Sequence, residues 1–319
     1  MNSICILGAG RAGTTLAELL RKEERTLDIT VIDKKNYFFD KNYFLPLLFG
    51  KEKEKVINLN DFFSNLGINF INKEVERVNF SKKNLYFKDK STVGFEKLVI
   101  CTGLIHQDLS IKGEHRQGFF YLSEINPLSF RSYLKIASDF VIFASTILGV
   151  RLAFSLSFLN KEIKLISSSL DFLGKKKEEI ISILRRRNID VYENVEIVEV
   201  IGNSVVKATK VSLPKVFSSN VVIVDTHLLP NLKILETSLK EGELPPQVIL
   251  LGDVARKNTE KEHFFIFNSV NVYQEARALA TKIIKEGGGY FFAKVYTPQD
   301  IENFLDEEFN ERKILSWIS

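Results

Sequence analysis

The 319-residue sequence contains few of the residues that build disulfide frameworks, metal centres or hydrolytic sites. Its two cysteines, Cys5 and Cys101, form no C-x-x-C pair, which excludes a dithiol redox relay. The four histidines are scattered without metal-ligand spacing, and no G-x-S-x-G elbow indicates a serine hydrolase. We therefore expect no metal site, and we expect buried, unreactive cysteines in a reducing, cytoplasmic setting.

An excess of one charge and a long hydrophobic run are also lacking. The 44 basic and 40 acidic residues leave a net charge of only +4, which indicates no nucleic-acid partner. No run approaches the roughly 18 apolar residues that a transmembrane helix needs. Hydrophobic residues make up 45% of the chain, so a chain of this length can bury the cores of two domains.

The clearest motif is a glycine-rich turn near the N-terminus. An apolar strand runs into a G-x-G-x-x-G turn and a helix over 14–21, and a second strand over 29–32 ends in an acid. Such a unit binds an adenine dinucleotide: the turn and helix N-terminus hold the pyrophosphate, and the acid accepts hydrogen bonds from a ribose. The first glycine makes the turn, the second admits the pyrophosphate and the third allows close helix packing. The candidate residues are Gly8, Gly10, Arg11, Ala12, Gly13, Asp33 and Lys34.

Two later strands indicate which dinucleotide is bound. Residues 96–103 end in Thr102-Gly103, and residues 248–255 contain Gly252-Asp253 after an apolar run. With the first turn, they resemble the three FAD signatures of the two-dinucleotide-binding flavoproteins, the pyridine nucleotide-disulfide oxidoreductase superfamily. The resemblance implies bound FAD, with the Thr-Gly turn close to it and Asp253 hydrogen-bonded to its ribityl chain.

Within this superfamily the sequence is most similar to type II NADH dehydrogenases and sulfide:quinone reductases. Asn36-Tyr37 and the stretch 44–49 resemble a family segment whose proline, here Pro46, lies in a loop near the isoalloxazine ring. Residues 274–283 resemble a helix beside the flavin and quinone, and Asn268 or Ser269 would cap its N-terminus. The resemblance implies electron transfer to a quinone. Whether Cys101 faces the flavin stays open.

The middle of the chain departs from the family at its expected NAD(H) site. A strand over 139–144 and a following helix predict a second dinucleotide fold. The departures are Ala144 and Thr146 in place of two glycines, Arg151 in place of glutamate, serines at 167–169 in place of a ribose-binding acid, and His227 in place of a glycine. We expect the Thr146 side chain to stand where a pyrophosphate needs bare backbone. The nicotinamide site is then lost, or the cation and hydroxyls favour the 2′-phosphate of NADPH.

These segments predict an α/β fold with two Rossmann-like domains, the second inserted in the first. We expect an FAD domain over 1–117 and 237–289, an inserted degenerate NAD-like domain over 118–236, and a C-terminal helical tail over 290–319. The tail has an apolar stripe and an acidic face. It is therefore expected to pack or form a homodimer rather than dock on the inner face of a membrane.

Two functions remain open. The first is an FAD-dependent oxidoreductase that passes electrons to a quinone or another acceptor, with an unassigned donor: NAD(P)H at an altered site, a protein such as ferredoxin, or a small reductant. The alternative is an FAD-binding, non-catalytic or sensing protein whose second domain is a structural or partner-binding module. The intact FAD elements argue against a protein that binds no flavin. The sequence identifies no catalytic residue.

Overall fold

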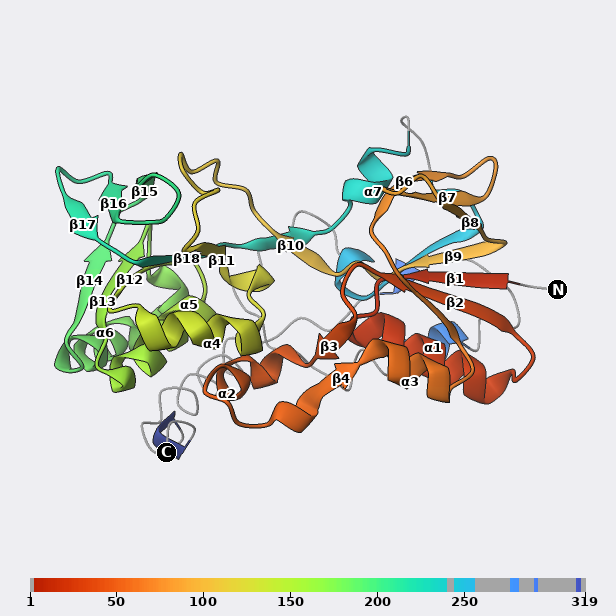
Figure 1. The fold of residues 1–319 in the computed structure, drawn as a ribbon, viewed down its shortest axis with the longest axis horizontal. Helices are drawn as coiled ribbons and strands as arrows, with labels where there is room; N and C mark the ends of the chain where they lie inside the picture. The colour runs from red at the N-terminus through yellow and green to blue at the C-terminus, as the bar shows by residue number, and fades with distance from the viewer. Residues whose placement is uncertain (1–2, 240–243, 256–275, 281–289, 292–313, 317–319) are drawn as a thin grey trace.

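The computed structural model describes residues 3–239, 244–255, 276–280, 290–291 and 314–316. Two parallel β-sheets dominate these segments and lie towards opposite ends of an elongated molecule (Figure 1). The chain builds most of the first sheet, crosses to the second, and then returns to add strands to the first. The predicted α/β fold with two Rossmann-like sheets is thereby confirmed.

The first sheet is parallel, with the strand order β21-β20-β9-β1-β2-β5. Helices α1 (Arg11–Glu23) and α3 (Leu59–Asn65) pack their apolar faces on one side of this sheet. A small antiparallel sheet and the short helix α7 cover the other side. The elements are β1 (Ser3–Leu7), β2 (Asp28–Asp33), β5 (Asn69–Asn72), β9 (Lys97–Ile100), β20 (Val248–Leu251), β21 (Tyr290–Phe291), the small-sheet strands β6 (Val75–Asn79), β7 (Asn84–Phe87) and β8 (Thr92–Gly94), and α7 (Lys233–Glu236).

The second sheet repeats this arrangement with the strand order β11-β18-β12-β13-β14. Helices cover one face, and an antiparallel sheet of three strands covers the other. The strands are β11 (Phe119–Tyr121), β12 (Asp139–Ala144), β13 (Glu162–Ser167), β14 (Ile189–Glu193) and β18 (Val221–Asp225), with β15 (Ile197–Ile201), β16 (Ala208–Val211) and β17 (Val216–Ser218) above them. The helices are α4 (Pro127–Ile136), α5 (Ile147–Leu156) and α6 (Lys177–Arg186).

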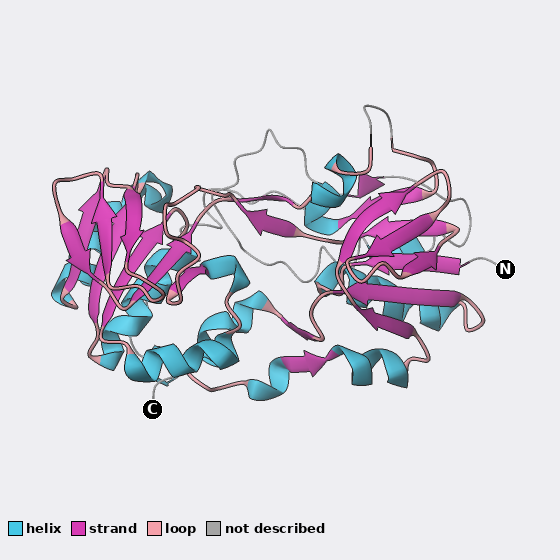
Figure 2. Ribbon diagram, turned by 45° about the horizontal axis from the view of Figure 1, so that its top comes forward, coloured by secondary structure: helices cyan, strands magenta, loops and turns pink. Residues whose placement is uncertain are grey.

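Two pieces of structure join the sheets, as Figure 2 shows. Strand β10 (Leu104–His106) pairs antiparallel with β19 (Leu228–Pro230), so both crossings of the chain lie side by side. The hairpin-like pair β3 (Tyr37–Phe39) and β4 (Val56–Asn58) flanks α2 (Phe44–Leu48), whose apolar residues join the core of the second unit. Short 3₁₀ turns complete the fold: η1 (Lys41–Tyr43), η2 (Lys53–Lys55), η3 (Leu122–Glu124), η4 (Ser157–Leu159), η5 (Asp171–Lys176) and η6 (Gly252–Ala255).

Local sequence explains where the helices of the second unit begin and end. Asn126 caps α4, accepting a hydrogen bond from the Leu128 amide at 2.9 Å, and Pro127 occupies the first helical position. Helix α5 is almost entirely buried, so it lacks a polar face. Helix α6 instead carries acidic residues in its first turn and basic residues in its last, as the helix dipole favours.

Several predicted features lie outside the described residues. The capping residues Asn268 and Ser269 and most of the tail over 290–319 belong to them, although residues 276–280 and 314–316 are helical. The expectations about a homodimer and a membrane-facing helix therefore stay predictions. Within the described segments, none of the helices has the length and apolar content needed to span a bilayer.

Candidate functional site

The glycines of the first turn are required for two different reasons. Gly8 has φ +108°, and a Cβ there would lie 2.4 Å from the carbonyl oxygen of Cys101. A Cβ on Gly13 would lie 1.9 Å from the carbonyl oxygen of Gly8. These two glycines let the chain's own backbone segments approach closely. Gly10 differs, because a Cβ there would meet nothing within 4 Å. The space beside Gly10 is thus open to a ligand.

The N-terminus of α1 offers unsatisfied donors to that space. Gly10 is the N-cap residue of α1, and as a glycine it has no side chain that could cap the helix. Among the described residues, the amides of Gly10, Ala12 and Gly13 have no hydrogen-bond acceptor, whereas Thr14 N–H already donates to the Gly10 carbonyl at 2.9 Å. Amides at a helix N-terminus carry partial positive charge and bind phosphate oxygens. The turn therefore has the chemistry of a pyrophosphate site.

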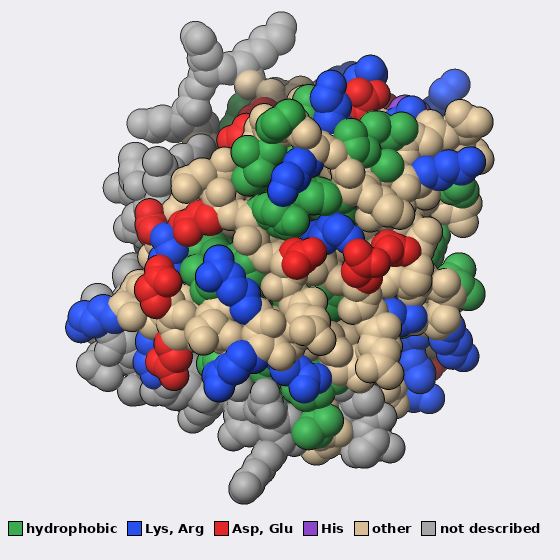
Figure 3. Space-filling model, turned by 90° about the vertical axis from the view of Figure 1, so that its left-hand side faces the viewer, with side chains coloured by type: hydrophobic (Ala, Val, Ile, Leu, Met, Phe, Trp, Pro, Cys, Tyr) green, Lys and Arg blue, Asp and Glu red, His purple; other side chains and the backbone are tan. Residues whose placement is uncertain are grey.

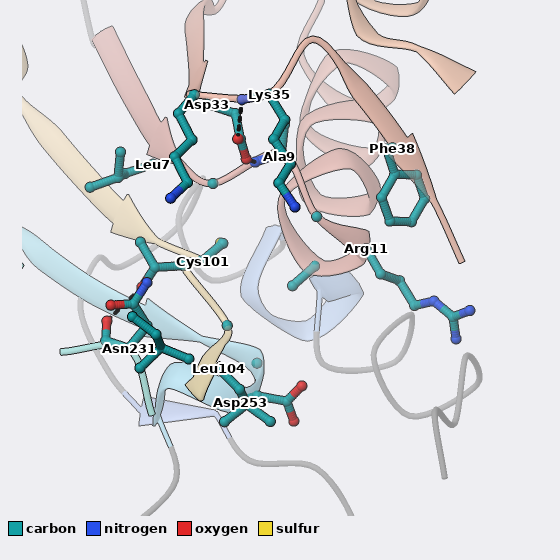
Figure 4. A pocket seen from close by; sticks show the side chains of 18 of the residues that line it. Leu7, Ala9, Arg11, Asp33, Lys35, Phe38, Cys101, Leu104, Asn231 and Asp253 are labelled. Carbon is teal, nitrogen blue, oxygen red and sulfur yellow. Dashed lines mark hydrogen bonds between the residues drawn. The ribbon is translucent and has the colours of Figure 1, made fainter. Parts of the chain in front are cut away.

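Asp33 lies at the end of β2, beside this turn (Figure 4). Its Oδ2 accepts a hydrogen bond from the Ala9 amide at 2.7 Å, and its Oδ1 accepts one from the Lys35 amide at 2.8 Å. Both bonds hold the carboxylate in a fixed orientation at the cavity wall. Each oxygen has a second lone pair, so the fixed carboxylate can still accept a ribose hydroxyl.

The two later FAD-like segments reach the same place. The Thr102 hydroxyl donates to the Asn231 carbonyl at 2.9 Å, and the Asn231 amide donates to the Gly103 carbonyl at 2.9 Å. This clamp fixes the Thr-Gly turn. Gly252, with φ +77°, would bring a Cβ within 3.1 Å of the Ala12 side chain, so the turn before Asp253 lies against α1. Figure 4 shows Asp253 and Asp33 reaching one cavity from different strands.

The cavity bounded by these segments has a volume of about 800 Å³. Cofactor pockets commonly measure roughly 300–1,000 Å³, so a dinucleotide fits by size. Ten of the twelve predicted binding residues line it: Gly8, Gly10, Arg11, Ala12, Asp33, Lys34, Thr102, Gly103, Gly252 and Asp253. Gly13 is buried behind the turn. Cys101 also lines the cavity, and burial raises the pKa of its thiol far above the ordinary value, so the sulfur is protonated.

Pro46 is placed differently from the expectation. We expected a loop beside the flavin, but Pro46 lies inside α2, is buried, and does not line the cavity. Its neighbours Phe44 and Leu45 pack against the core of the second unit instead. The apolar content of this stretch explains the difference, because five consecutive buried side chains are better accommodated by a short helix between two domains than by an open loop.

The structure also places side chains in the cavity that no sequence motif indicates. Lys41 lines it, and burial lowers the pKa of Lys41 to about 8; the Lys35 cation adds to this effect and the Asp253 carboxylate opposes it. Arg11 forms an ion pair with Asp40 at the same wall. A lysine and an aspartate in a polar stretch are common on any surface, so only the tertiary structure could identify these residues.

A second group missed by the sequence lies where β10 leaves the cavity. The ring of His106 stacks on Tyr121 with centroids 3.8 Å apart, and the Tyr121 hydroxyl donates to Glu114 Oε2 at 2.7 Å. Burial lowers the pKa of His106, with Glu124 opposing the shift, so the imidazole is uncharged at neutral pH. In the described part of the chain, His106 Nδ1 and Ser123 Oγ are buried without hydrogen-bond partners. Both residues line the cavity, where a polar ligand could satisfy them.

The second turn, which joins β12 to α5 and corresponds to the first glycine-rich turn, has a different interior. Thr146 is buried, and its hydroxyl accepts a hydrogen bond from the Leu148 amide at the N-terminus of α5, at 3.2 Å. The Thr146 hydroxyl also donates to Asp225 Oδ2 at 2.8 Å. The amides of Thr146 and Gly149 donate to the same oxygen at 3.1 Å and 3.0 Å. Asp225, at the end of β18, is therefore the residue that fills this turn.

Two other residues of the expected NAD(H) site, Ser167 and Arg151, are largely shielded from solvent. The Ser167 hydroxyl, at the end of β13, donates to the Ala144 carbonyl at 2.6 Å. Burial lowers the pKa of Arg151, on α5, to about 9. The basic run that begins α6 is partly neutralised, since Lys177 donates to Asp171 Oδ1 at 2.9 Å. On the end of the second unit seen in Figure 3, basic, acidic and hydrophobic side chains are interspersed.

Comparisons with known proteins agree with this architecture. The sequence model of the family described as pyridine nucleotide-disulphide oxidoreductase matches residues 2–243. A ferredoxin–NAD(+) reductase component of the p-cumate 2,3-dioxygenase system of Pseudomonas putida is 22% identical over 214 residues, which cover 64% of this chain and 53% of that protein. The chain thus spans about half the length of this curated relative.

Solved structures resemble the fold at low sequence identity. The putidaredoxin reductase–putidaredoxin complex matches with a TM-score of 0.76 and 17% identity, covering 90% of this chain and 76% of that chain. The sulfide:quinone oxidoreductase of Aquifex aeolicus matches with a TM-score of 0.69 and 17% identity, covering 90% of this chain and 77% of that chain. Identities this low establish similarity of fold.

Proposed function

Because the chain belongs to the pyridine nucleotide-disulphide oxidoreductase family, we propose that it is an FAD-dependent oxidoreductase. It passes electrons through a non-covalently bound flavin to a quinone or another acceptor. The observation that carries this proposal is the first turn, where the amides of Gly10, Ala12 and Gly13 have no acceptor in the part of the chain that the structure describes and lie beside a dinucleotide-sized cavity. Such a turn is built for a pyrophosphate.

Each wall of the cavity has a role in holding the cofactor. The first turn binds the pyrophosphate, and the fixed Asp33 carboxylate accepts the adenosine ribose hydroxyls. Asp253, which enters the cavity after β20, is suited to the ribityl chain. The buried polar atoms His106 Nδ1 and Ser123 Oγ gain partners when the cavity is filled. Binding therefore gives hydrogen-bond partners to buried polar atoms that have none among the described residues.

Bound FAD supplies the redox chemistry, since it accepts and releases electrons in one-electron or two-electron steps. The protein contributes electrostatics at the inner cavity. With its pKa near 8, Lys41 carries a proton on Nζ at neutral pH, so a cation lines the cavity that Asp253 also lines. A cation in a recessed site stabilises negative charge that develops nearby. The uncharged His106 adds no second cation there.

The relatives suggest the class of electron partner. The matched proteins include a ferredoxin–NAD(+) reductase component, a reductase in complex with putidaredoxin, and a sulfide:quinone oxidoreductase. We propose a quinone, a small molecule or a small electron-transfer protein as partner of this chain. The likeness to type II NADH dehydrogenases stays a prediction, as do the FAD-domain segments over 1–117 and 237–289 and the inserted domain over 118–236.

The test is an anaerobic absorbance titration of the purified protein after saturation with FAD and desalting. We expect a retained flavin band that dithionite bleaches and that a water-soluble quinone restores. The Gly10→Glu variant is the matched control: its side chain enters open space, so the fold persists while the carboxylate repels the pyrophosphate. A wild-type protein that retains no flavin refutes the proposal.

One observation favours a second function. The expected nicotinamide turn is filled by Asp225, as a domain with only a structural or partner-binding role would permit. In that case the protein is a non-catalytic or sensing flavoprotein. The titration separates the two functions: a flavin that dithionite reduces but that neither quinone nor a ferredoxin-type protein reoxidises faster than free FAD supports the second.

A further inference from the structure

The first turn, before α1, and the second turn, before α5, can be compared position by position. Counted from the N-cap residue of the helix that follows each turn, Thr146, Leu148 and Gly149 occupy the places of Gly10, Ala12 and Gly13. In the first turn these three amides have no acceptor among the described residues. In the second turn all three are satisfied within the protein: Thr146 and Gly149 donate to Asp225 Oδ2, and Leu148 donates to the Thr146 hydroxyl at 3.2 Å.

The retained glycine of the second turn has a reason that involves no cofactor. A Cβ on Gly149 would lie 2.6 Å from Asp225 Oδ2 and 2.9 Å from the Ala144 side chain. Glycine is therefore needed at this position because the carboxylate is there. Ala144 stands in place of the first glycine and is absent from the positive-φ residues of the described chain, unlike Gly8. The turn follows a path adapted to its own aspartate.

The space between this turn and the flavin cavity is also filled. Among the described residues, a cavity of about 30 Å³ lies beside Asp225 and Thr226. That volume is enough for roughly two waters, since each needs about 10–15 Å³ on this measure. Aromatic and aliphatic side chains from both units close the rest: Phe39, Phe44, Leu122, Ile125, Leu148 and Leu228. A nicotinamide ring would have to displace them to reach the flavin side.

We propose that Asp225 closes the second dinucleotide fold. Its carboxylate takes the amides that would bind a dinucleotide pyrophosphate and places a negative charge at the N-terminus of α5, so NADH and NADPH do not bind. Asp225 is then the specificity-determining residue of this domain. The consequence for catalysis rests on the proposed function: electrons enter the flavin from a donor that does not use the nicotinamide turn.

The test asks whether removing the carboxylate opens the turn. FAD-saturated wild-type protein and the double variant Asp225→Ala, Thr146→Gly are titrated with ADP-ribose and with NADH by isothermal titration calorimetry. We expect no heat of binding for the wild type up to millimolar ligand, and at least a tenfold gain in affinity for the double variant. Asp190→Ala, which removes an exposed carboxylate from the same sheet, is the matched control and should gain nothing.

Two results would overturn the proposal. Wild-type protein that binds ADP-ribose as tightly as the double variant shows that Asp225 does not close the turn. A double variant with native circular dichroism and no gain in affinity shows that something other than Asp225 closes it. A measurement without any variant covers the case of misfolding: amide hydrogen exchange over 144–149 should be the same with and without ADP-ribose. Slower exchange with the ligand contradicts closure.

These experiments distinguish a failure of the proposal about Asp225 from a failure of the proposal that the chain binds FAD. Flavin uptake is measured first, by absorbance, and its failure concerns the first turn alone. If the chain takes up no FAD, the same titrations are made on proteins that also carry Gly10→Glu, so that ligand cannot enter the first turn. The effect of Asp225 on the affinity for ADP-ribose and NADH is then measured independently of flavin binding.

Discussion

The burial of Asp225 should make the stability of the second unit depend on pH. Burial raises the pKa of Asp225 from its ordinary 3.8 to about 6, although the Thr146 hydroxyl and the amides of Gly149 and Thr146 oppose the shift. Between these two values the folded protein holds a proton that the unfolded chain has released. Stability therefore falls as the pH rises through this window, and the loss is complete above the folded-state value.

The size of the effect follows from the shift. One pKa unit corresponds to about 1.4 kcal/mol, so ionised Asp225 lowers the free energy of unfolding by roughly 3 kcal/mol at pH 7.5. About 2 kcal/mol of this develops between pH 4.5 and pH 7.5. The variant Asp225→Asn keeps an acceptor oxygen for the two amides and cannot ionise. Its stability relative to the wild type should therefore increase by about 2 kcal/mol over this range.

Urea unfolding followed by far-ultraviolet circular dichroism, at pH 4.5 and pH 7.5, measures this difference. With an m-value of about 2 kcal/mol per M, the midpoints of the two proteins should separate by roughly 1 M more at the higher pH. Asp190→Asn, at an exposed position on β14, controls for loss of a surface charge and should change stability by less than about 0.5 kcal/mol. A difference between Asp225→Asn and wild type that does not vary with pH would refute the reasoning.

Three further predictions concern the first turn and the core. Gly10→Glu should abolish flavin retention in the absorbance assay while leaving the melting temperature within a few degrees, and retention at wild-type level would remove the turn from the binding site. Gly13→Ala should destabilise the protein by about 3 kcal/mol in urea, because the new Cβ would lie 1.9 Å from the Gly8 carbonyl oxygen; an unchanged midpoint contradicts this geometry. Phe154→Ala, at a side chain with no exposure, should cost about 4 kcal/mol, whereas Ile136→Ala, 80% exposed, should cost under about 0.5 kcal/mol; equal losses from these two variants would count against the described core.

The first turn could be predicted from the sequence because all of its determinants are local. Gly8, Gly10, Gly13 and Asp33 belong to one strand–helix–strand unit, and their spacing alone brings the carboxylate to the Ala9 amide. Apolar runs likewise predicted strands β1, β2, β9 and β20 of the first sheet and β12 of the second. The helix α1 begins at Arg11, three residues earlier than expected, since the turn residues already adopt helical geometry.

Features that depend on contacts between the two units could not be predicted in this way. Pro46 carried the signal of a family loop, yet the buried residues around it pack as a helix against the second unit. Lys41 and His106 carried no signal at all. Their positions depend on how the two units meet, and nothing within a few residues of either encodes that contact.

The sequence by itself determined the two parallel sheets, the open first turn and the weakness of the second. It determined them because glycine spacing and apolar periodicity act over a few residues. Only the tertiary structure showed why the second turn is closed. Parallel pairing of β12 with β18 sets Ala144 opposite Asp225, and this register carries a carboxylate to Thr146 across 79 positions of sequence. A hydrogen bond between such distant residues exists only once the sheet has formed.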